Sequence, residues 1–335
     1  MLNFFKSNNL AIVFANAVLI ILYRIVYFFR PLDISRIYRH AEPASKFFIR
    51  IFHIGPQTNL ALLLTSGGLL CFLGSLQINS IINSYRVTTR KNFLGGLLFV
   101  IFTSIVPECM IPGPALISAL ILIVCIDKIF ALAKPDKLYG HIFDLGFLSG
   151  LALLFYFPAI YFLIFVSIGF FTMRSVSFRE RVMIFTGFAS VLAVVFTVYF
   201  WFDSLPEMVL DMINIQYRVP LSFSNLSVWQ IITVTWLGMI STYVLVNIPG
   251  LLFSSVIQTR KYINILVIGA GLSLLAIPLA FNFNLSHLVF LLVSLSIIAA
   301  FYFVETKSNL INEILFIVLI LSVFILEYLP FFVAI

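Results

Sequence analysis

Charged residues are the scarcest class in this sequence. Only 10% of its 335 residues are Asp, Glu, Lys or Arg, whereas soluble globular domains contain about 25%. Apolar residues make up 62% of the chain and the mean hydropathy is +1.14. This composition excludes an ordinary soluble domain and predicts an integral membrane protein. Its spans are expected to be helices, because a helix satisfies its backbone hydrogen bonds within one segment.

Cysteine, histidine and phosphate-binding glycine motifs are also sparse. The cysteines Cys71, Cys109 and Cys125 lie in or beside apolar runs without CxxC spacing, which indicates neither a disulfide framework nor a zinc site. The four histidines have no metal-binding spacing, and the GxxxxGK[ST] motif does not occur. We therefore expect no cofactor, no divalent metal and no nucleic-acid partner. The glycine pairs in SGGLL and LGGLL are expected to allow close helix packing.

Apolar stretches separated by charged residues, proline and asparagine predict about eleven membrane spans. The expected fold is all-α, a polytopic transmembrane bundle that forms one integral membrane domain over 1–335. The N-terminal stretch is interpreted as a retained first helix, because it has no small-x-small cleavage site. The predicted spans are 10–29, 58–78, 93–107, 113–132, 142–157, 159–173, 182–202, 228–256, 263–281, 286–304 and 312–333.

The distribution of Lys and Arg predicts the orientation, because cytoplasmic loops carry an excess of both. With the N-terminus in the cytoplasm, 13 of the 20 basic residues are inside, six are outside and Arg24 lies within the first span. Five of the six outside residues lie in the first outside loop, 30–57. In this loop, apolar residues recur at helical spacing with basic residues opposite, which predicts two amphipathic helices in the membrane interface.

The outside loops contain the candidate catalytic and binding residues. Asp33 follows the first span and Glu108 follows the third, and either carboxylate could act as a general base on an acceptor hydroxyl. Guanidinium groups nearby could neutralise a lipid phosphate. The candidate phosphate-binding residues are Arg30, Arg36 and Arg39 in loop 30–57, and Arg218 in loop 203–227.

Each of these residues also has a simpler interpretation. Asp33 could cap a helix, and Glu108 could be a solvated carboxylate at the membrane rim. The arginines of the first loop could contact lipid headgroups, and Arg218 could pair with Asp211 or with lipid. Arg24 could pair with a carboxylate across the bundle, but we expect it to extend outward to the headgroups. We expect Glu327, near the outer end of the last span, to lie at the interface.

Residues 30–173 resemble the GT-C class of membrane glycosyltransferases, which use polyprenyl-phosphate sugars. The resemblance rests on an acidic residue after the first span, on QINSIINSYRVTTRKNFLGGLLFVIFTSIVPE, and on GFLSGLALLFYFPAIYFLIF at 146–165. It implies a GT-C-like module over 1–173, with additional transmembrane helices over 174–335. The sequence departs from many members in having a single Asp instead of an acidic pair in the first loop, and it has no large soluble domain. The whole chain is also similar to a family of polytopic bacterial membrane proteins of unknown function.

The resemblance implies that the protein transfers a sugar, with mannose as a candidate, from a polyprenyl-phosphate carrier to an acceptor outside the bacterial inner membrane. Asp33 is then the candidate base, Glu108 the second acidic residue and Arg218 a phosphate contact. The expected partners are membrane lipids and the lipid-linked sugar, which is a substrate. Two alternatives stay open. One is a non-catalytic subunit that binds another membrane protein, and the other is a transporter of lipid or solute.

Overall fold

The computed structural model describes residues 5–7, 9–29, 59–133, 138–174, 177–206, 228–277, 285–306 and 310–333. These residues form helices and no strand, which confirms the predicted all-α class. The interfacial helices predicted in loop 30–57 fall outside the described residues. Five candidate site residues fall outside them as well, namely Arg30, Asp33, Arg36, Arg39 and Arg218.

Within the described residues, eleven α-helices of ten or more residues occupy the eleven apolar stretches. Seven of them, α2, α5, α7, α10, α12, α14 and α15, are long and apolar enough to cross a membrane, which fits a multi-pass membrane protein. The number of eleven spans stays a prediction, since α6, α8 and α9 are shorter and α13 carries two basic residues in its first turns. The helices are α2 (Ala11–Phe29), α5 (Leu60–Ser84), α6 (Leu94–Ser104), α7 (Pro114–Ala131), α8 (Leu138–Phe155), α9 (Tyr161–Met173), α10 (Phe178–Trp201), α12 (Val228–Phe253), α13 (Ile257–Leu275), α14 (Val289–Glu305) and α15 (Leu310–Val333).

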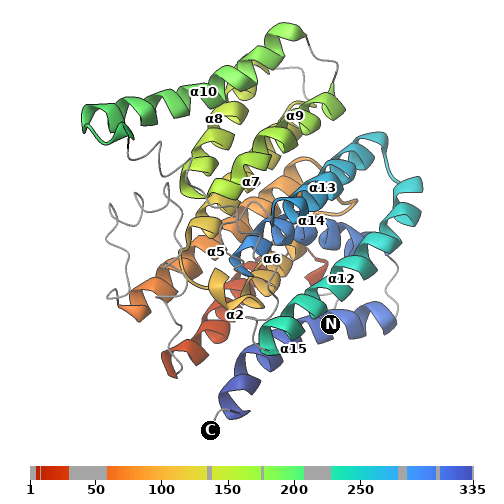
Figure 1. Cartoon of the computed structure of the whole chain (residues 1–335). Coiled ribbons are helices and arrows are strands. Elements are labelled where there is room, and N and C mark those ends of the chain that lie inside the picture. Colours follow the sequence, from red (N-terminus) through yellow and green to blue (C-terminus); the bar gives the residue numbers. More distant parts are fainter. Residues whose placement is uncertain are drawn as a thin grey trace.

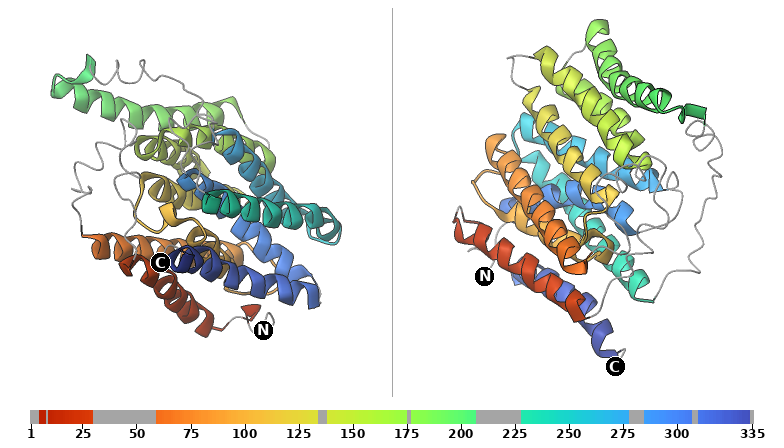
Figure 2. Two further views of the ribbon diagram at one scale, coloured as in Figure 1. Left: turned by 60° about the horizontal axis from the view of Figure 1, so that its bottom comes forward. Right: turned by 90° about the vertical axis from the view of Figure 1, so that its left-hand side faces the viewer.

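Helix α14 lies in the centre of the bundle and α10 at one edge (Figures 1 and 2). The sequence of α14 is apolar all around the helix, so it can be surrounded by protein, and 89% of its span is buried. Helices α2 and α15 lie at the edge opposite α10. Only 17% of the α10 span is buried, because α10 packs mainly against α8.

Glycines allow close helix contacts, as predicted for the pair that contains Gly96, and also at Gly146 and Gly187, which are outside the predicted pairs. A Cβ at Gly96 would overlap the Asn79 side chain, whose Oδ1 accepts a hydrogen bond of 2.7 Å from the Gly96 N–H. A Cβ at Gly146 would overlap the Ile184 carbonyl oxygen, and one at Gly187 would overlap the Phe143 carbonyl oxygen. Helices α8 and α10 therefore touch backbone to backbone where they cross.

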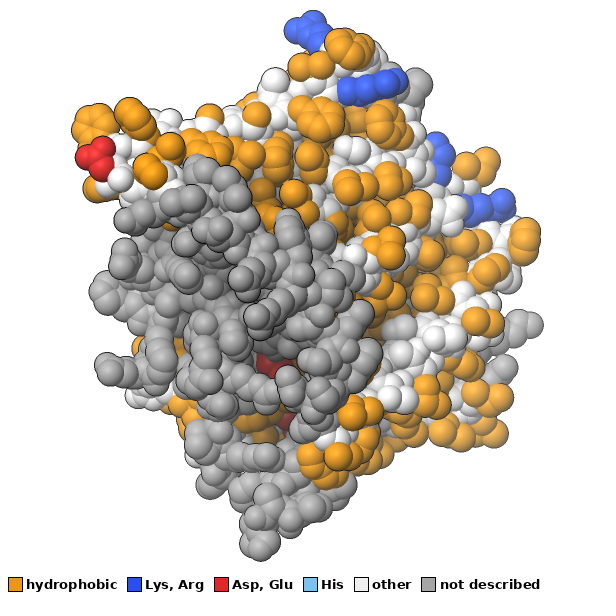
Figure 3. Space-filling model, viewed as in Figure 1, with side chains coloured by type: hydrophobic (Ala, Val, Ile, Leu, Met, Phe, Trp, Pro, Cys, Tyr) orange, Lys and Arg blue, Asp and Glu red, His pale blue; other side chains and the backbone are white. Residues whose placement is uncertain are grey.

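Basic residues gather at one end of the bundle, where α2 begins. Lys6 Nζ donates to the Thr306 carbonyl oxygen at 3.2 Å, which joins the segment before α2 to the end of α14. Lys261 Nζ donates to the Met173 carbonyl oxygen at 3.4 Å, which joins the start of α13 to the end of α9. Figure 3 shows Lys and Arg side chains along one edge of a largely hydrophobic face. We call this end the basic end. Ten of the eleven described basic residues lie there, namely Lys6, Arg86, Arg90, Lys91, Lys128, Arg174, Arg179, Arg181, Arg260 and Lys261.

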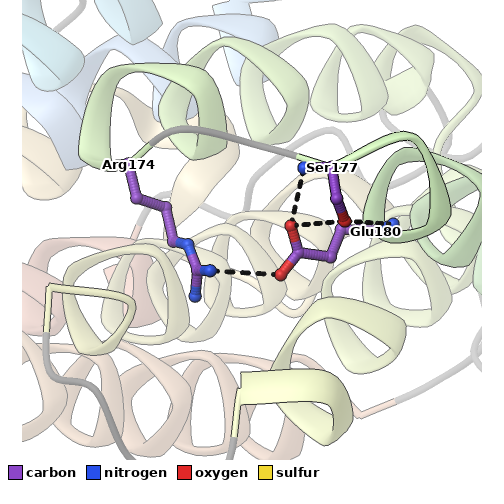
Figure 4. A network of polar contacts seen from close by, with 3 residues as sticks. All are labelled: Arg174, Ser177 and Glu180. Atoms are coloured by element: carbon purple, nitrogen blue, oxygen red, sulfur yellow. Dashed lines mark hydrogen bonds and ion pairs between the residues drawn. The ribbon is translucent and has the colours of Figure 1, made fainter.

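Local side-chain contacts order the start of α10 at the basic end (Figure 4). Ser177 and Glu180 form a capping box, in which each side chain bonds to the backbone N–H of the other residue. Arg174 forms an ion pair of 3.2 Å with the same Glu180 carboxylate. The predicted cytoplasmic charges thus share one end of the bundle, while the side of the membrane that this end faces stays a prediction.

Candidate functional site

The end opposite the basic end contains a turn that lies within the length of the bundle. Helix α6 has 11 residues and is about 16 Å long, half of the about 30 Å thickness of the hydrocarbon core. The 3-10 turn η1 (Pro107–Cys109) follows. A Cβ at Gly67 would overlap the Met110 carbonyl oxygen, which places this turn beside Gly67. Gly67 is seven residues along α5 from Leu60, or about 10 Å inward.

Backbone without regular helical hydrogen bonds is tolerated at such depth only where protein or water surrounds it. Around η1, protein does so. Ile105, Val106, Cys109, Met110 and Ile111 are each at most 1% exposed. The backbone around η1 is therefore buried in the interior of the bundle. Glu108, the acidic residue of η1, is positioned by the surrounding protein.

Glu108 is the only one of the six predicted site residues that the structure describes. It is half-buried, and its Oε1 accepts a hydrogen bond of 3.1 Å from Gln230 Nε2. Gln230 lies in the first turn of α12, which starts directly after loop 203–227. The structure therefore joins Glu108 to the base of the loop that carries Arg218. The alternative of a carboxylate at the membrane rim stays open, because Gln230 lies in the outermost turn of α12.

Arg24 approaches the same turn from α2. Its side chain is only 4% exposed, which contradicts the expectation that it extends outward to the headgroups. Nε donates to the Met110 carbonyl oxygen at 3.4 Å, and Nη2 donates to Cys71 Sγ at 3.3 Å. The arginine side chain passes beside Gly68 of α5. A Cβ at Gly68 would lie 3.4 Å from Arg24 Nε.

A tyrosine–histidine pair lies next to η1, and sequence reasoning missed it. The turn η5 (Leu285–Leu288) packs against η1, and its His287 Nε2 lies 3.3 Å from the hydroxyl of Tyr156. Both residues are buried, and Phe290 packs against the Tyr156 ring. His287 has no metal-binding spacing, so the sequence pattern does not select it. The available signal was that Tyr156 and His287 both border predicted spans at the same end of the bundle.

Helices α2 and α15 are fastened to each other at this end by tyrosines. The Tyr328 hydroxyl donates to the Leu22 carbonyl oxygen at 2.6 Å, and the Tyr27 hydroxyl donates to the Glu327 carboxylate. Glu327 is 6% exposed, so its carboxylate faces protein, while its position at the depth of the membrane interface stays a prediction. These contacts anchor the last turns of α2, the helix that precedes Asp33.

The described charges at this end are mainly acidic. They are Glu108, Asp203 and Glu327, against the single cation Arg24. An anionic ligand at this end would therefore depend on cations from the loops, which fall outside the described residues. In the part of the chain that the structure describes, no group of three or more His, Cys, Asp or Glu residues could hold a metal ion.

No family model, curated protein or solved structure matches this chain. The resemblance to the GT-C class accordingly stays a prediction from the sequence pattern.

Proposed function

We propose that the protein is a membrane glycosyltransferase that moves a sugar from a polyprenyl-phosphate carrier to an acceptor outside the bacterial inner membrane, with its N-terminus in the cytoplasm. One observation carries the proposal. The Glu108 carboxylate is held within the bundle by Gln230, at the end opposite the basic end. The helices that flank loops 30–57 and 203–227 have their loop-facing ends at this same end, and the two loops carry the candidate arginines and Asp33.

The reaction needs a base for the acceptor and positive charge for the leaving group. The base, Asp33 or Glu108, takes the proton of the acceptor hydroxyl, and the acceptor oxygen forms a bond to the anomeric carbon of the sugar. The bond from that carbon to the carrier phosphate oxygen breaks, and the phosphate leaves with the electron pair. Arg30, Arg36, Arg39 and Arg218 are proposed to stabilise the charge on that phosphate.

The proposal is tested in a strain that lacks the protein and expresses variants at equal membrane levels. We expect Asp33→Asn or Glu108→Gln to reduce sugar transfer by about 100-fold or more, the range for loss of a general base. The lipid-linked sugar donor should accumulate while the acceptor glycan is shortened. Asp203→Asn is the matched control, because Asp203 is an exposed acid at the same end of the bundle. Unchanged glycans in both Asp33→Asn and Glu108→Gln would exclude the transferase.

A second candidate function is a non-catalytic subunit that binds another membrane protein. It is favoured by α10, whose span is only 17% buried and whose exposed side chains include Phe185 and Val194. Such a subunit should co-purify with its partner in a fixed ratio, and its function should not change in Asp33→Asn or Glu108→Gln. The same variants therefore distinguish the two candidates.

A further inference from the structure

Arg24 is a buried cation with no acidic partner among the described residues. The described ion pairs are Lys128–Asp144 and Arg174–Glu180, both at the basic end. An arginine keeps its proton in proteins, so a buried guanidinium must be stabilised by hydrogen bonds when no carboxylate pairs with it. Besides Met110 and Cys71, Arg24 contacts the Ile20 carbonyl oxygen, to which Nη1 donates at 3.4 Å.

These contacts join three parts of the bundle at one point. Arg24 belongs to α2, Cys71 belongs to α5, and Met110 is the residue directly after η1. Cys71 extends the connection, because its Sγ donates a long hydrogen bond of 3.9 Å to the Cys109 carbonyl oxygen. The two residues directly after Glu108 are thus held by their carbonyl oxygens, one by Arg24 itself and the other by the thiol that Arg24 contacts.

We propose that Arg24 is a positioning residue that fixes the η1 turn, and with it the Glu108 carboxylate, at its depth in the bundle. The planar guanidinium suits this role because it presents several N–H donors in a fixed arrangement. It supplies donors to a non-helical segment at a depth where water is scarce. The catalytic meaning of this role rests on the proposed function, whereas the mechanical role of Arg24 does not.

The native cysteines provide a direct test in the full-length protein. Cys109 is in η1 and Cys125 is in α7, and both are at most 1% exposed. A small maleimide is applied to the detergent-solubilised protein, and the labelling rate of each cysteine is measured by mass spectrometry. In Arg24→Met we expect Cys109 to react about ten-fold faster, which corresponds to a change of about 1.4 kcal/mol in local opening. The Cys125 rate should not change, and it is the internal control.

Arg24→Lys gives a second, milder variant. Lysine keeps the positive charge, but its single ammonium group cannot reach all the acceptors that the arginine fork contacts. We therefore expect a labelling rate of Cys109 between those of the native protein and Arg24→Met. An unchanged Cys109 rate in Arg24→Met would overturn the proposal. Faster labelling of Cys109 and Cys125 together would overturn it too, because it would show a general loosening of the bundle. If Arg24→Met does not fold, a Cys109 rate in Arg24→Lys equal to the native rate overturns it.

Labelling and sugar transfer are independent measurements, so the two proposals fail separately. Suppose that Cys109 is labelled faster in Arg24→Met, while glycans are normal in Asp33→Asn and Glu108→Gln. This result would support the positioning role of Arg24 and exclude the transferase function. The single variant Arg24→Met should have a lower rate of sugar transfer than the native protein. Adding Arg24→Met to Glu108→Gln should not lower the rate of sugar transfer further. A further loss of transfer in the double variant would show that Arg24 does not act through Glu108.

Discussion

Gly67 is the position where the smallest change should most disturb the candidate site. In Gly67→Ala the new Cβ would overlap the Met110 carbonyl oxygen and lie 2.9 Å from both Met110 C and Ile111 Cα. An ordinary contact is 3.4 Å or more, so each of these carbon atoms must retreat by at least about 0.5 Å. All three atoms belong to the backbone and cannot rotate away as a side chain would.

The expected cost follows from this rigidity. Overpacking a close-packed interior typically costs about 1–3 kcal/mol. We therefore expect the free energy of unfolding of Gly67→Ala to lie below that of a glycine-to-alanine change at an open helix position, which gains the same helix preference, by this amount. The displacement also moves η1, and a misplacement of about 1 Å can reduce catalysis by about 100-fold. Activity should therefore fall further than the loss of folded protein explains.

Stability is measured by titrating the detergent-solubilised protein with a denaturing detergent and following helix content. Gly238→Ala is the matched control, because Gly238 is in helix α12 and a Cβ there would have no neighbour within 4 Å. It should be at least as stable as the native protein, since alanine favours helix by about 1 kcal/mol over glycine. Equal stability of Gly67→Ala and Gly238→Ala would refute the close contact between α5 and the η1 turn.

Two further predictions concern the edge helix and the basic end. Gly146→Leu should detach α10 from α8, because the Ile184 backbone occupies that space. Hydrogen exchange should then quicken in α10 but not in α14, and unchanged α10 protection would contradict the packing. Burial, followed by the nearby Arg90, lowers the pKa of Lys6 from 10.5, although Glu305 and Glu313 oppose this. The unfolded state therefore binds more protons between the lowered pKa and 10.5, so stability rises with pH in this window. The melting temperature of the native protein, relative to that of Lys6→Met, should therefore increase as pH rises towards 10.5. A difference in melting temperature that does not change with pH would contradict the lowered pKa.

Much of the fold was predictable because it depends on local properties of the chain. The apolar runs gave the position of every described long helix, for example 113–132 for α7 (Pro114–Ala131). The charge pattern also indicated which ends of the helices lie together. A helix forms through hydrogen bonds between residues four apart, and apolar length decides whether it suits a bilayer. Neither property requires knowledge of the neighbouring helices.

The candidate site was predictable only in part. Glu108 could be selected because acidic residues are rare in this chain and it follows an apolar run. Its partner Gln230 lies 122 residues further along the chain, and nothing in the sequence connects the two. Arg24 and Met110 are 86 residues apart, and His287 and Tyr156 are 131 residues apart. Such pairs follow from the packing of helices that are distant in sequence.

The sequence by itself determined that this is a helical protein suited to a membrane, with one basic end. Only the tertiary structure decided that Arg24 and Glu327 point into protein and that η1 lies within the bundle. The physical reason is that an apolar helix in a membrane can present any of its faces to lipid or to protein with little difference in hydrophobic energy. The close contact of Gly67 with Met110, and the hydrogen bonds of Arg24 to Met110 and Cys71, select which face is turned inward.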